Sequence, residues 1–352
     1  MPSDILKVFI APAIAFFTGI SISPIFSHFA YKYKWWKKNG SKGEGLGGGA
    51  TPIFDKLHGN TESEIKTPRM GGAIIWASVF LTAFFLYAVA HLIPSSFSYK
   101  VTFVSRNQTW LPLFTLLIGS VVGLWNDYKD IVTSSTGVSR GISLAKRVVL
   151  ITILGLVCGW WFYAKLDVSS ISLPLFGEVT LGLLIVPLFS IIMLGLYSGG
   201  IIDGIDGLSG GVFASIYGAY SIIAFFNHQI DLAAFCAAVV GAILAFLWFN
   251  IPPARFWMTE TGTMALTITI TAVAFLTNSI AVLPIIALPL VLTTLSSVIQ
   301  VGSKKFRGKK VFLIAPLHHH FEAIGWPSYK VTMRYWIISV VCAIIGSVLA
   351  LI

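Results

Sequence analysis

The chain has 352 residues, of which 56% are hydrophobic and only 11% are charged, and its mean hydropathy is +0.84. This composition excludes a soluble globular protein of this size and predicts a polytopic membrane protein built from helices. Basic loops at a membrane surface explain the net charge of +10, so we expect no nucleic-acid partner. Cys158, Cys236 and Cys342 lie in apolar segments without disulfide or metal-ligand spacing, which indicates packing roles.

Ten apolar segments follow one another, and several are close to the ~20 residues that cross a bilayer. They cover residues 5–30, 70–93, 108–125, 147–165, 179–198, 211–227, 232–249, 262–277, 280–300 and 333–352. The first segment has no small-residue cleavage pattern, so we expect a retained span. Residues 1–352 are therefore predicted to form a single all-α transmembrane domain with about ten helices.

The basic residues of the loops predict the orientation in the membrane. One alternating set of loops carries 19 Lys and Arg residues, whereas the other set carries 3. Loops rich in Lys and Arg remain in the cytoplasm. Both termini are therefore expected outside the cytoplasm, and the richly basic loops inside it.

Four short polar patches lie at span ends on the predicted cytoplasmic side. Ionisable groups are costly near a bilayer, so they indicate function there. The patches are Gly123 to Lys129, Ile202 to Leu208, Asn250 to Gly262, and His318 to Glu322. Because all four share one side, they are predicted to assemble one active site at the cytoplasmic face.

The second patch contains two acids three residues apart. One helical turn would place Asp203 and Asp206 on the same face, and paired carboxylates suit a divalent metal or a nucleotide contact. Two solvated loop acids are the alternative.

In the first patch, Asp127 precedes several bases, and this composition fits phosphate handling. The acid would hold a metal or accept a proton, and the bases would hold phosphate oxygens. An ordinary basic loop is the alternative there.

The remaining two patches also allow more than one interpretation. Glu260 stands just before an apolar span, where it either caps a helix N-terminus or completes a metal site with Asp127 or Asp203. Three consecutive histidines, His318 to His320, cannot all point in one direction. We therefore expect one or two of these imidazoles to reach a diphosphate.

The patches resemble, in order and spacing, the motifs of the polyprenyl-phosphate N-acetylhexosamine-1-phosphate transferases, a family of the glycosyltransferase 4 type. The motifs are Thr67-Pro68-Arg69-Met70-Gly71-Gly72, Asn126-Asp127, Asp203-Gly204-Ile205-Asp206-Gly207-Leu208, Asn250 to Gly262, and His318-His319-His320-Phe321-Glu322. The histidine triplet, with Gly325-Trp326 after it, is typical of the muramoyl-pentapeptide branch of that family.

The resemblance implies an enzyme of peptidoglycan synthesis in the bacterial inner membrane. Phospho-N-acetylmuramoyl-pentapeptide would pass from its UDP derivative to undecaprenyl phosphate, giving lipid I and UMP, with Mg²⁺ bridging the diphosphate. The partners implied are the UDP-linked sugar-peptide, undecaprenyl phosphate, the lipid bilayer and a second copy in a homodimer. A related transferase for another UDP-N-acetylhexosamine and a non-catalytic homologue that binds the lipid carrier or nucleotide are the alternatives.

The family roles transfer residue by residue. The catalytic set implied is Asp127, Asp203, Glu260, His318, His319 and His320, and the first three would also bind the metal. The substrate-binding set implied is Lys66, Asn126, Lys129, Lys146, Asp206, Asn250 and Trp257.

Several positions depart from the family pattern. Asn126 replaces the first acid of an Asp-Asp pair, and an amide neither takes a proton nor serves as a charged ligand. Glu260 replaces the metal-binding aspartate, and Thr259 before it replaces a glycine. Arg69 stands where a smaller polar residue is usual. Asp130 occupies the place of a lysine and is a candidate substitute for the lost acid.

Overall fold

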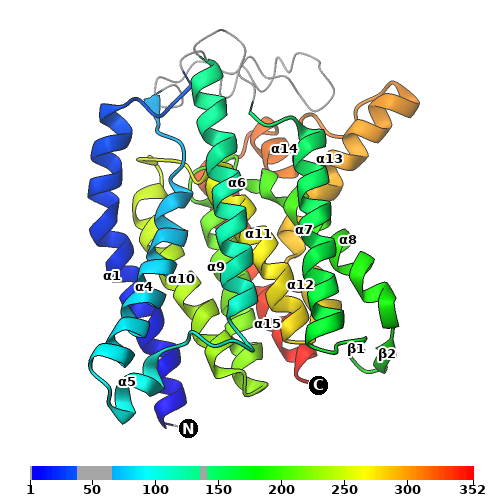
Figure 1. The fold of residues 1–352 in the computed structure, drawn as a ribbon. Helices are drawn as coiled ribbons and strands as arrows, with labels where there is room; N and C mark the ends of the chain where they lie inside the picture. Colours follow the sequence, from blue (N-terminus) through cyan, green and yellow to red (C-terminus); the bar gives the residue numbers. More distant parts are fainter. Residues whose placement is uncertain (1, 38–65, 135–140) are drawn as a thin grey trace.

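The computed structural model describes residues 2–37, 66–134 and 141–352, which form a bundle of helices (Figure 1). In this part of the chain, nine helices are long and apolar enough to cross a membrane. The number becomes ten when Ile280–Ile286 and Leu288–Arg307, which meet at a bend of 78°, count as one span. The prediction of an all-α polytopic membrane protein with about ten spans is confirmed.

The helices follow the predicted apolar segments closely. The long ones are α1 (Pro2–Lys32), α4 (Gly72–Leu92), α6 (Trp110–Ser134), α7 (Leu144–Lys165), α8 (Ile185–Ser198), α9 (Leu208–Phe226), α10 (Ile230–Asn250), α11 (Thr259–Leu276), α13 (Leu288–Arg307) and α15 (Ser328–Ala350). The short ones are α5 (Ser96–Val101), α12 (Leu283–Ile286), α14 (Leu317–Ala323) and the 3₁₀ turns η1 (Gly182–Leu184), η2 (Gly199–Ile202) and η3 (Ile280–Val282).

A β-hairpin between α7 and α8 was not predicted. Its strands β1 (Ser170–Leu173) and β2 (Gly177–Thr180) pair antiparallel, with Ser170 opposite Thr180. All four side chains of β2 are exposed, so the apolar residues there do not begin a span. The predicted start of the fifth span at residue 179 is corrected to Gly182.

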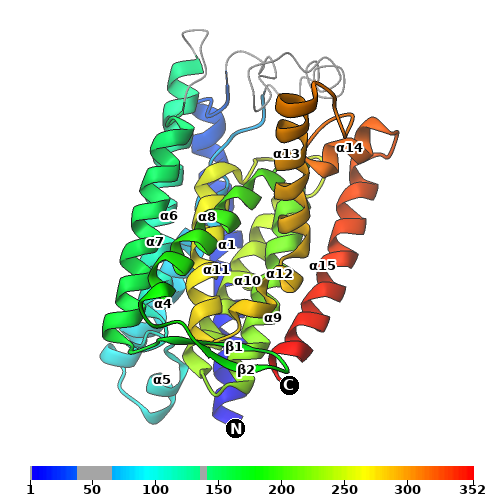
Figure 2. The ribbon, with the colours of Figure 1, turned by 90° about the vertical axis from the view of Figure 1, so that its right-hand side faces the viewer.

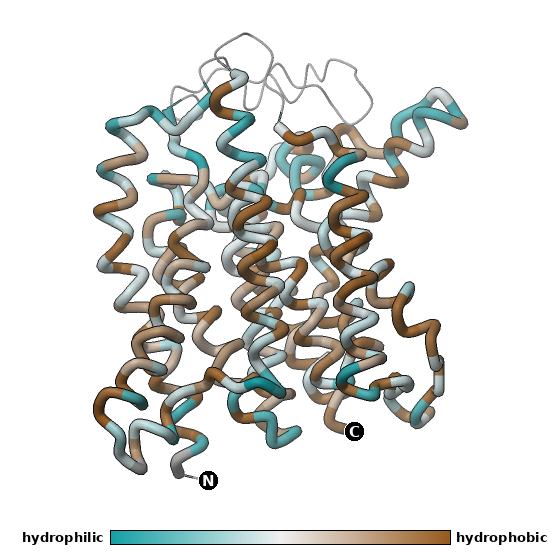
Figure 3. The backbone as a smooth tube through the Cα atoms, viewed as in Figure 1, coloured by the Kyte–Doolittle hydropathy of each residue, from teal (hydrophilic) through white to brown (hydrophobic). Residues whose placement is uncertain are grey.

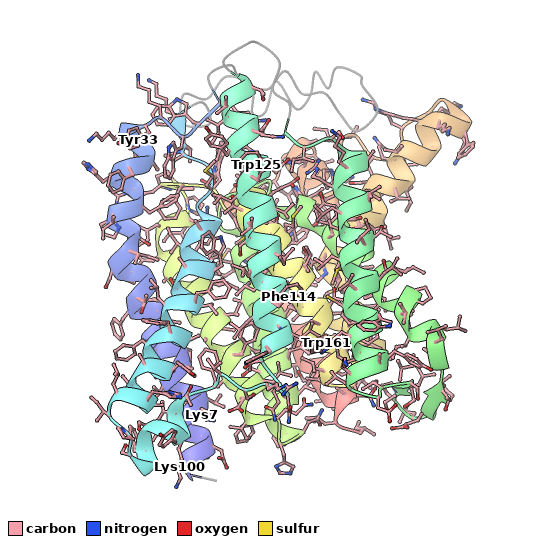
Figure 4. All side chains as sticks on the ribbon, viewed as in Figure 1. Lys7, Tyr33, Lys100, Phe114, Trp125 and Trp161 are labelled. Atoms are coloured by element: carbon pink, nitrogen blue, oxygen red, sulfur yellow. The ribbon has the colours of Figure 1, made fainter. Side chains whose placement is uncertain are left out.

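The two ends of the bundle differ in what they carry. Both chain termini lie at one end, and α14 lies at the other (Figures 1 and 2). Apolar residues dominate the middle of the bundle, and hydrophilic residues gather towards its ends (Figure 3). Lys7 and Lys100 lie near the terminal end, and Tyr33 and Trp125 lie near the opposite end (Figure 4). This distribution matches a protein that spans a bilayer.

Helix α11 lies inside the bundle, packed against α4, α6, α8 and α9. It is the most deeply buried span of the described helices, with 89% of its span buried, although it is rich in threonine. Several of these hydroxyls donate to the carbonyl one turn earlier, as Thr267 does to Thr263 at 2.7 Å and Thr271 does to Thr267 at 3.2 Å. Polar side chains are tolerated inside the bundle because the helix itself satisfies them.

Small residues bring α6 and α11 into close contact. A Cβ atom at Gly119 would lie 2.7 Å from the Cα atom of Ala265, and one at Gly123 would collide with the carbonyl of Glu260. Gly119, Gly123 and Asp127 are spaced four residues apart, so they lie along one face of α6. The close contact therefore brings the Asp127 carboxylate to the first turn of α11.

Gly119→Ala is expected to destabilise the protein by about 1–3 kcal/mol, because the added methyl group meets the backbone of α11. Gly218→Ala is the matched control, since Gly218 also lies within a span and its Cβ position is open. Replacing that helical glycine with alanine should stabilise the protein by about 0.5–1 kcal/mol. Thermal unfolding in detergent measures both changes, and equal melting temperatures for the two variants would contradict the packing described.

Candidate active site

A cavity of about 1460 Å³ opens where η2, α11, α13 and α14 meet. Residues from three of the four predicted patches line it: Asp203, Asp206, Asn250, Trp257, Glu260 and His319. The other predicted residues lie outside its lining: Lys66, Asn126, Asp127, Lys129, Lys146, His318 and His320. The structure therefore brings distant segments together, but only some of their predicted side chains line the cavity.

Asp127 is buried behind the cavity and binds the first turn of α11. Its Oδ2 atom accepts hydrogen bonds from the Thr259 hydroxyl at 2.5 Å, the Thr261 hydroxyl at 2.6 Å and the Thr261 N–H at 2.7 Å. A carboxylate is favourable at a helix N-terminus, because the N–H groups there lack partners within the helix. The geometry gives Asp127 the role of holding α11 in place.

Asp203 holds the same helix end from the cavity side. Its Oδ2 atom accepts from the Thr259 N–H at 2.7 Å, and its Oδ1 atom accepts from the Ser209 hydroxyl at 2.6 Å. Burial raises the pKa of this carboxyl above its ordinary value, while both hydrogen bonds and the nearby Arg69 guanidinium oppose the rise. Asp203 is thus a partly buried acid whose ionised form is stabilised by donors of the protein.

The residue between these two acids has an unusual backbone. Thr259 has φ +52°, and Met70, before α4, has φ +67°. A β-branched residue at positive φ is strained, and surrounding contacts must compensate for the strain. The Met70 N–H donates to the Thr259 Oγ1 atom at 3.1 Å, and that hydroxyl donates to Asp127. The threonine hydroxyl therefore links α4, α6 and α11 at one point.

A second network joins the loop after η2 to the loop before α11. Asp206 accepts from the Ala254 N–H at 3.0 Å and from the Trp257 Nε1–H at 3.1 Å. Asn250 accepts from the Gly207 N–H at 3.0 Å and donates to the Phe256 carbonyl at 2.9 Å. These bonds fix the loops, and they leave the Trp257 ring in the cavity wall.

The three histidines have three different environments. His319 lines the cavity, and its Nδ1 atom lies 2.7 Å from Glu322 Oε2, whose other oxygen accepts from the Ser328 hydroxyl at 2.5 Å. The Nε2 atoms of His318 and His319 both pack against Gly204, where a Cβ atom would lie 2.6 and 2.7 Å from them. His320 accepts from the Leu313 N–H at 3.3 Å, outside the cavity lining.

Glu260 pairs with Arg147 of α7 through Oε1. The three-carboxylate metal cluster predicted from Asp127, Asp203 and Glu260 is not formed. Among the described residues, no group of three or more His, Cys, Asp or Glu side chains is placed to hold a metal ion. The physical reason is that two of these acids accept hydrogen bonds from the start of α11 and the third binds a guanidinium.

The predicted lysines lie on the surface. Lys66, Lys129 and Lys146 are exposed, and Lys129 lies 5.2 Å from the centre of the Trp125 ring. Asn126 is buried and accepts from the Ile142 N–H at 2.8 Å, so it fixes the start of the segment before α7. Asp130, the candidate substitute acid, pairs with Lys37 at 2.8 Å.

Arg147 is a basic residue of the cavity wall that the predicted substrate-binding set omits, although its neighbour Lys146 is included. The helical register of α7 indicates which of the two basic residues shares the buried face of the helix. Ile151, Leu154 and Cys158, which are buried, lie four, seven and eleven residues after Arg147 and share its face. The same offsets from Lys146 lead to exposed residues. The buried face of α7, continued by one turn towards the N-terminus, therefore includes Arg147 and excludes Lys146.

The chain is similar in sequence to known proteins over much of its length. Residues 109–278 match the glycosyl transferase family 4. The chain is 32% identical over 354 aligned residues to the phospho-N-acetylmuramoyl-pentapeptide-transferase of Geobacillus thermodenitrificans, with 98% of each chain covered. It is 31% identical to the protein of that name from Bacillus anthracis, with 96% of each covered. The protein of that name from Dichelobacter nodosus is 33% identical, with 80% of this chain and 79% of the relative covered.

These similarities define a membrane-embedded transferase of glycosyl transferase family 4. Within that class, the chain belongs to the family of the phospho-N-acetylmuramoyl-pentapeptide-transferases. The family predicted from the polar patches is confirmed.

Asp127→Ala is expected to lower the melting temperature, because three buried donors at the start of α11 lose their acceptor. A buried polar group left without a partner costs about 1–3 kcal/mol. Asp127→Asn keeps one oxygen acceptor and should lose less. An Asp127→Ala variant that unfolds at the wild-type temperature would show that the carboxylate does not hold the helix.

The raised pKa of Asp203 predicts a pH-dependent effect on stability. Its carboxyl contributes stability that is present below the ordinary pKa of aspartate and is lost as pH rises through the raised value. Asp203→Asn does not titrate at this position. The melting temperature of the variant relative to wild type should therefore increase between pH 4 and pH 8, and a difference independent of pH would contradict the assignment.

Proposed function

We propose that the protein transfers phospho-N-acetylmuramoyl-pentapeptide from its UDP derivative to undecaprenyl phosphate, forming lipid I and UMP. One observation carries the proposal: within a chain similar along its length to transferases of that name, the cavity unites residues of three family motifs. The relatives are bacterial, and the chain is a multi-pass membrane protein. We propose the inner membrane as its location and a homodimer as its assembly.

We propose that the nucleotide binds beside Asp206 and Trp257. Hydrogen bonds from Ala254, Trp257 and Gly207 hold the two loops together, so the aromatic ring has a fixed position in the cavity wall. A ring of this kind provides a face on which a uracil base stacks. Preorganised binding groups reduce the entropy lost when the donor binds.

The proposed chemistry is a direct displacement at phosphorus. An oxygen of the lipid phosphate attacks the phosphorus attached to the sugar, and the bond from that phosphorus to the UMP oxygen breaks. A phosphomonoester has a second pKa of about 6, so the attacking phosphate ionises without a base. Direct attack is favoured over a carboxylate intermediate because Asp127 lies outside the cavity lining and both oxygens of Asp203 accept hydrogen bonds.

The Mg²⁺ ion implied by the family resemblance stays a prediction. When bound at a diphosphate, such an ion offsets negative charge on the leaving phosphate. The described carboxylates do not fit the three-acid site, so no step of the proposed reaction is assigned to a metal.

The histidine triplet provides an internal test of the proposed function. The measurement is UMP release by purified protein with the UDP-linked sugar-peptide and undecaprenyl phosphate. His319→Ala should reduce turnover by about 10²-fold or more, because it removes an oriented imidazole from the cavity. His320→Ala should change turnover by less than about threefold, since that ring lies outside the lining.

Donor comparison separates the alternatives. Turnover with another UDP-N-acetylhexosamine, and not with the muramoyl-pentapeptide donor, would support a related transferase. Nucleotide binding without turnover of any donor would support the non-catalytic homologue, the alternative motivated by the sequence departures at Asn126 and Glu260.

A further inference from the structure

Two arginines of the cavity wall have unmet hydrogen-bonding capacity. Arg69 and Arg147 both line the cavity, and their side chains are only 22% and 19% exposed. The Nε atom of each is buried and has no hydrogen-bond partner among the described residues. A guanidinium is always charged and has five N–H donors, so burying it with unmet donors is costly.

The surroundings of Arg69 leave its guanidinium weakly paired. The ion pair that it forms is with Asp130, at 3.9 Å, which is too long for a hydrogen bond. The same Asp130 oxygen lies 2.8 Å from Lys37, which competes for its charge. Arg69 also acts electrostatically on Asp203, so its charge is close to the start of α11.

Glu260 and Tyr197 both hold the Arg147 side chain, and Tyr197 interacts with it through a side-chain hydrogen bond. Glu260 Oε1 pairs with the guanidinium, while Glu260 Oε2 is buried without a partner among the described residues. The pair is therefore not a fork with two parallel hydrogen bonds. Glu260 and Tyr197 position the guanidinium in the wall, and its Nε–H donor has no partner among the described residues.

Two acids of the cavity, Asp203 and Asp206, are in the opposite situation. Asp206 accepts from the Ala254 N–H and the Trp257 indole, and Asp203 accepts from Ser209 and the Thr259 N–H. The protein thus already supplies donors to these acids, whereas the guanidiniums retain unmet donors. The unmet donors of the two arginines therefore favour an anion as the ligand of this part of the cavity.

We propose that Arg69 and Arg147 bind the diphosphate of the nucleotide donor directly, so that nucleotide binding needs no divalent cation. This inference rests on the proposed function, because it assigns a diphosphate to the cavity. Planar guanidiniums bind phosphate oxygens through paired N–H donors, and both arginines line the cavity that would hold the diphosphate. Residues of the protein then supply positive charge that a metal ion would otherwise provide.

The test is the affinity of purified, detergent-solubilised protein for UDP, measured by calorimetry in EDTA and in MgCl₂. We expect the two dissociation constants to agree within about threefold. Arg69→Gln and Arg147→Gln should each weaken UDP binding in EDTA by about tenfold or more, the usual scale of a lost charged hydrogen bond. Uridine, which has no phosphate, should bind the variants as it binds wild type.

Lys310→Gln is the control, because Lys310 is likewise a basic residue but is exposed and outside the lining. Its affinity for UDP should equal that of wild type. Wild-type binding that weakens at least tenfold in EDTA would overturn the inference and leave the transferase proposal intact. Equal losses of uridine and UDP binding in the arginine variants would also overturn it. No UDP binding in either buffer would overturn both proposals.

Discussion

The start of α11 is the point on which the rest of the site depends. Three separate parts of the chain bind it: Asp127 of α6, Asp203 of the loop after η2, and Met70 before α4. The bonds converge on Thr259 and Thr261, where backbone N–H groups have no partners within the helix. Two carboxylates at this end satisfy those donors and interact favourably with the helix dipole, which offsets part of the cost of burying them.

This arrangement changes the roles of the charged residues. Asp127 and Asp203, which the family pattern assigns to a metal, bind the start of α11 instead. Arg69 and Arg147 lie in the cavity wall, and the Nε–H donor of each has no partner among the described residues. Thr259 contributes to the change, since it stands where the family has glycine. Its side chain makes the bond to Asp127 and accepts the bond from Met70, which glycine could not do. The hydroxyl compensates for the strain of a positive φ at a β-branched residue.

Much of the fold was predictable, and the errors have identifiable causes. Apolar runs marked the spans because a helix in lipid must be long, apolar and internally hydrogen-bonded. The hairpin at Ser170–Thr180 was missed because two four-residue strands give too short an alternation to separate from a loop. Among the site residues, Lys146 was predicted in place of Arg147 because the two residues share a positive charge, and only the helical register of α7 separates them.

The sequence by itself determined the membrane class, the approximate spans and the family, because these depend on local apolar length and on ordered motifs. Only the tertiary structure decided which polar groups face the cavity. Asp127 and Asp203 belong to different patches, yet they bind one threonine because Gly119 and Gly123 bring α6 against α11. Which side chain faces a cavity depends on the rotation and contacts of whole helices, and spacing within a single patch does not specify these.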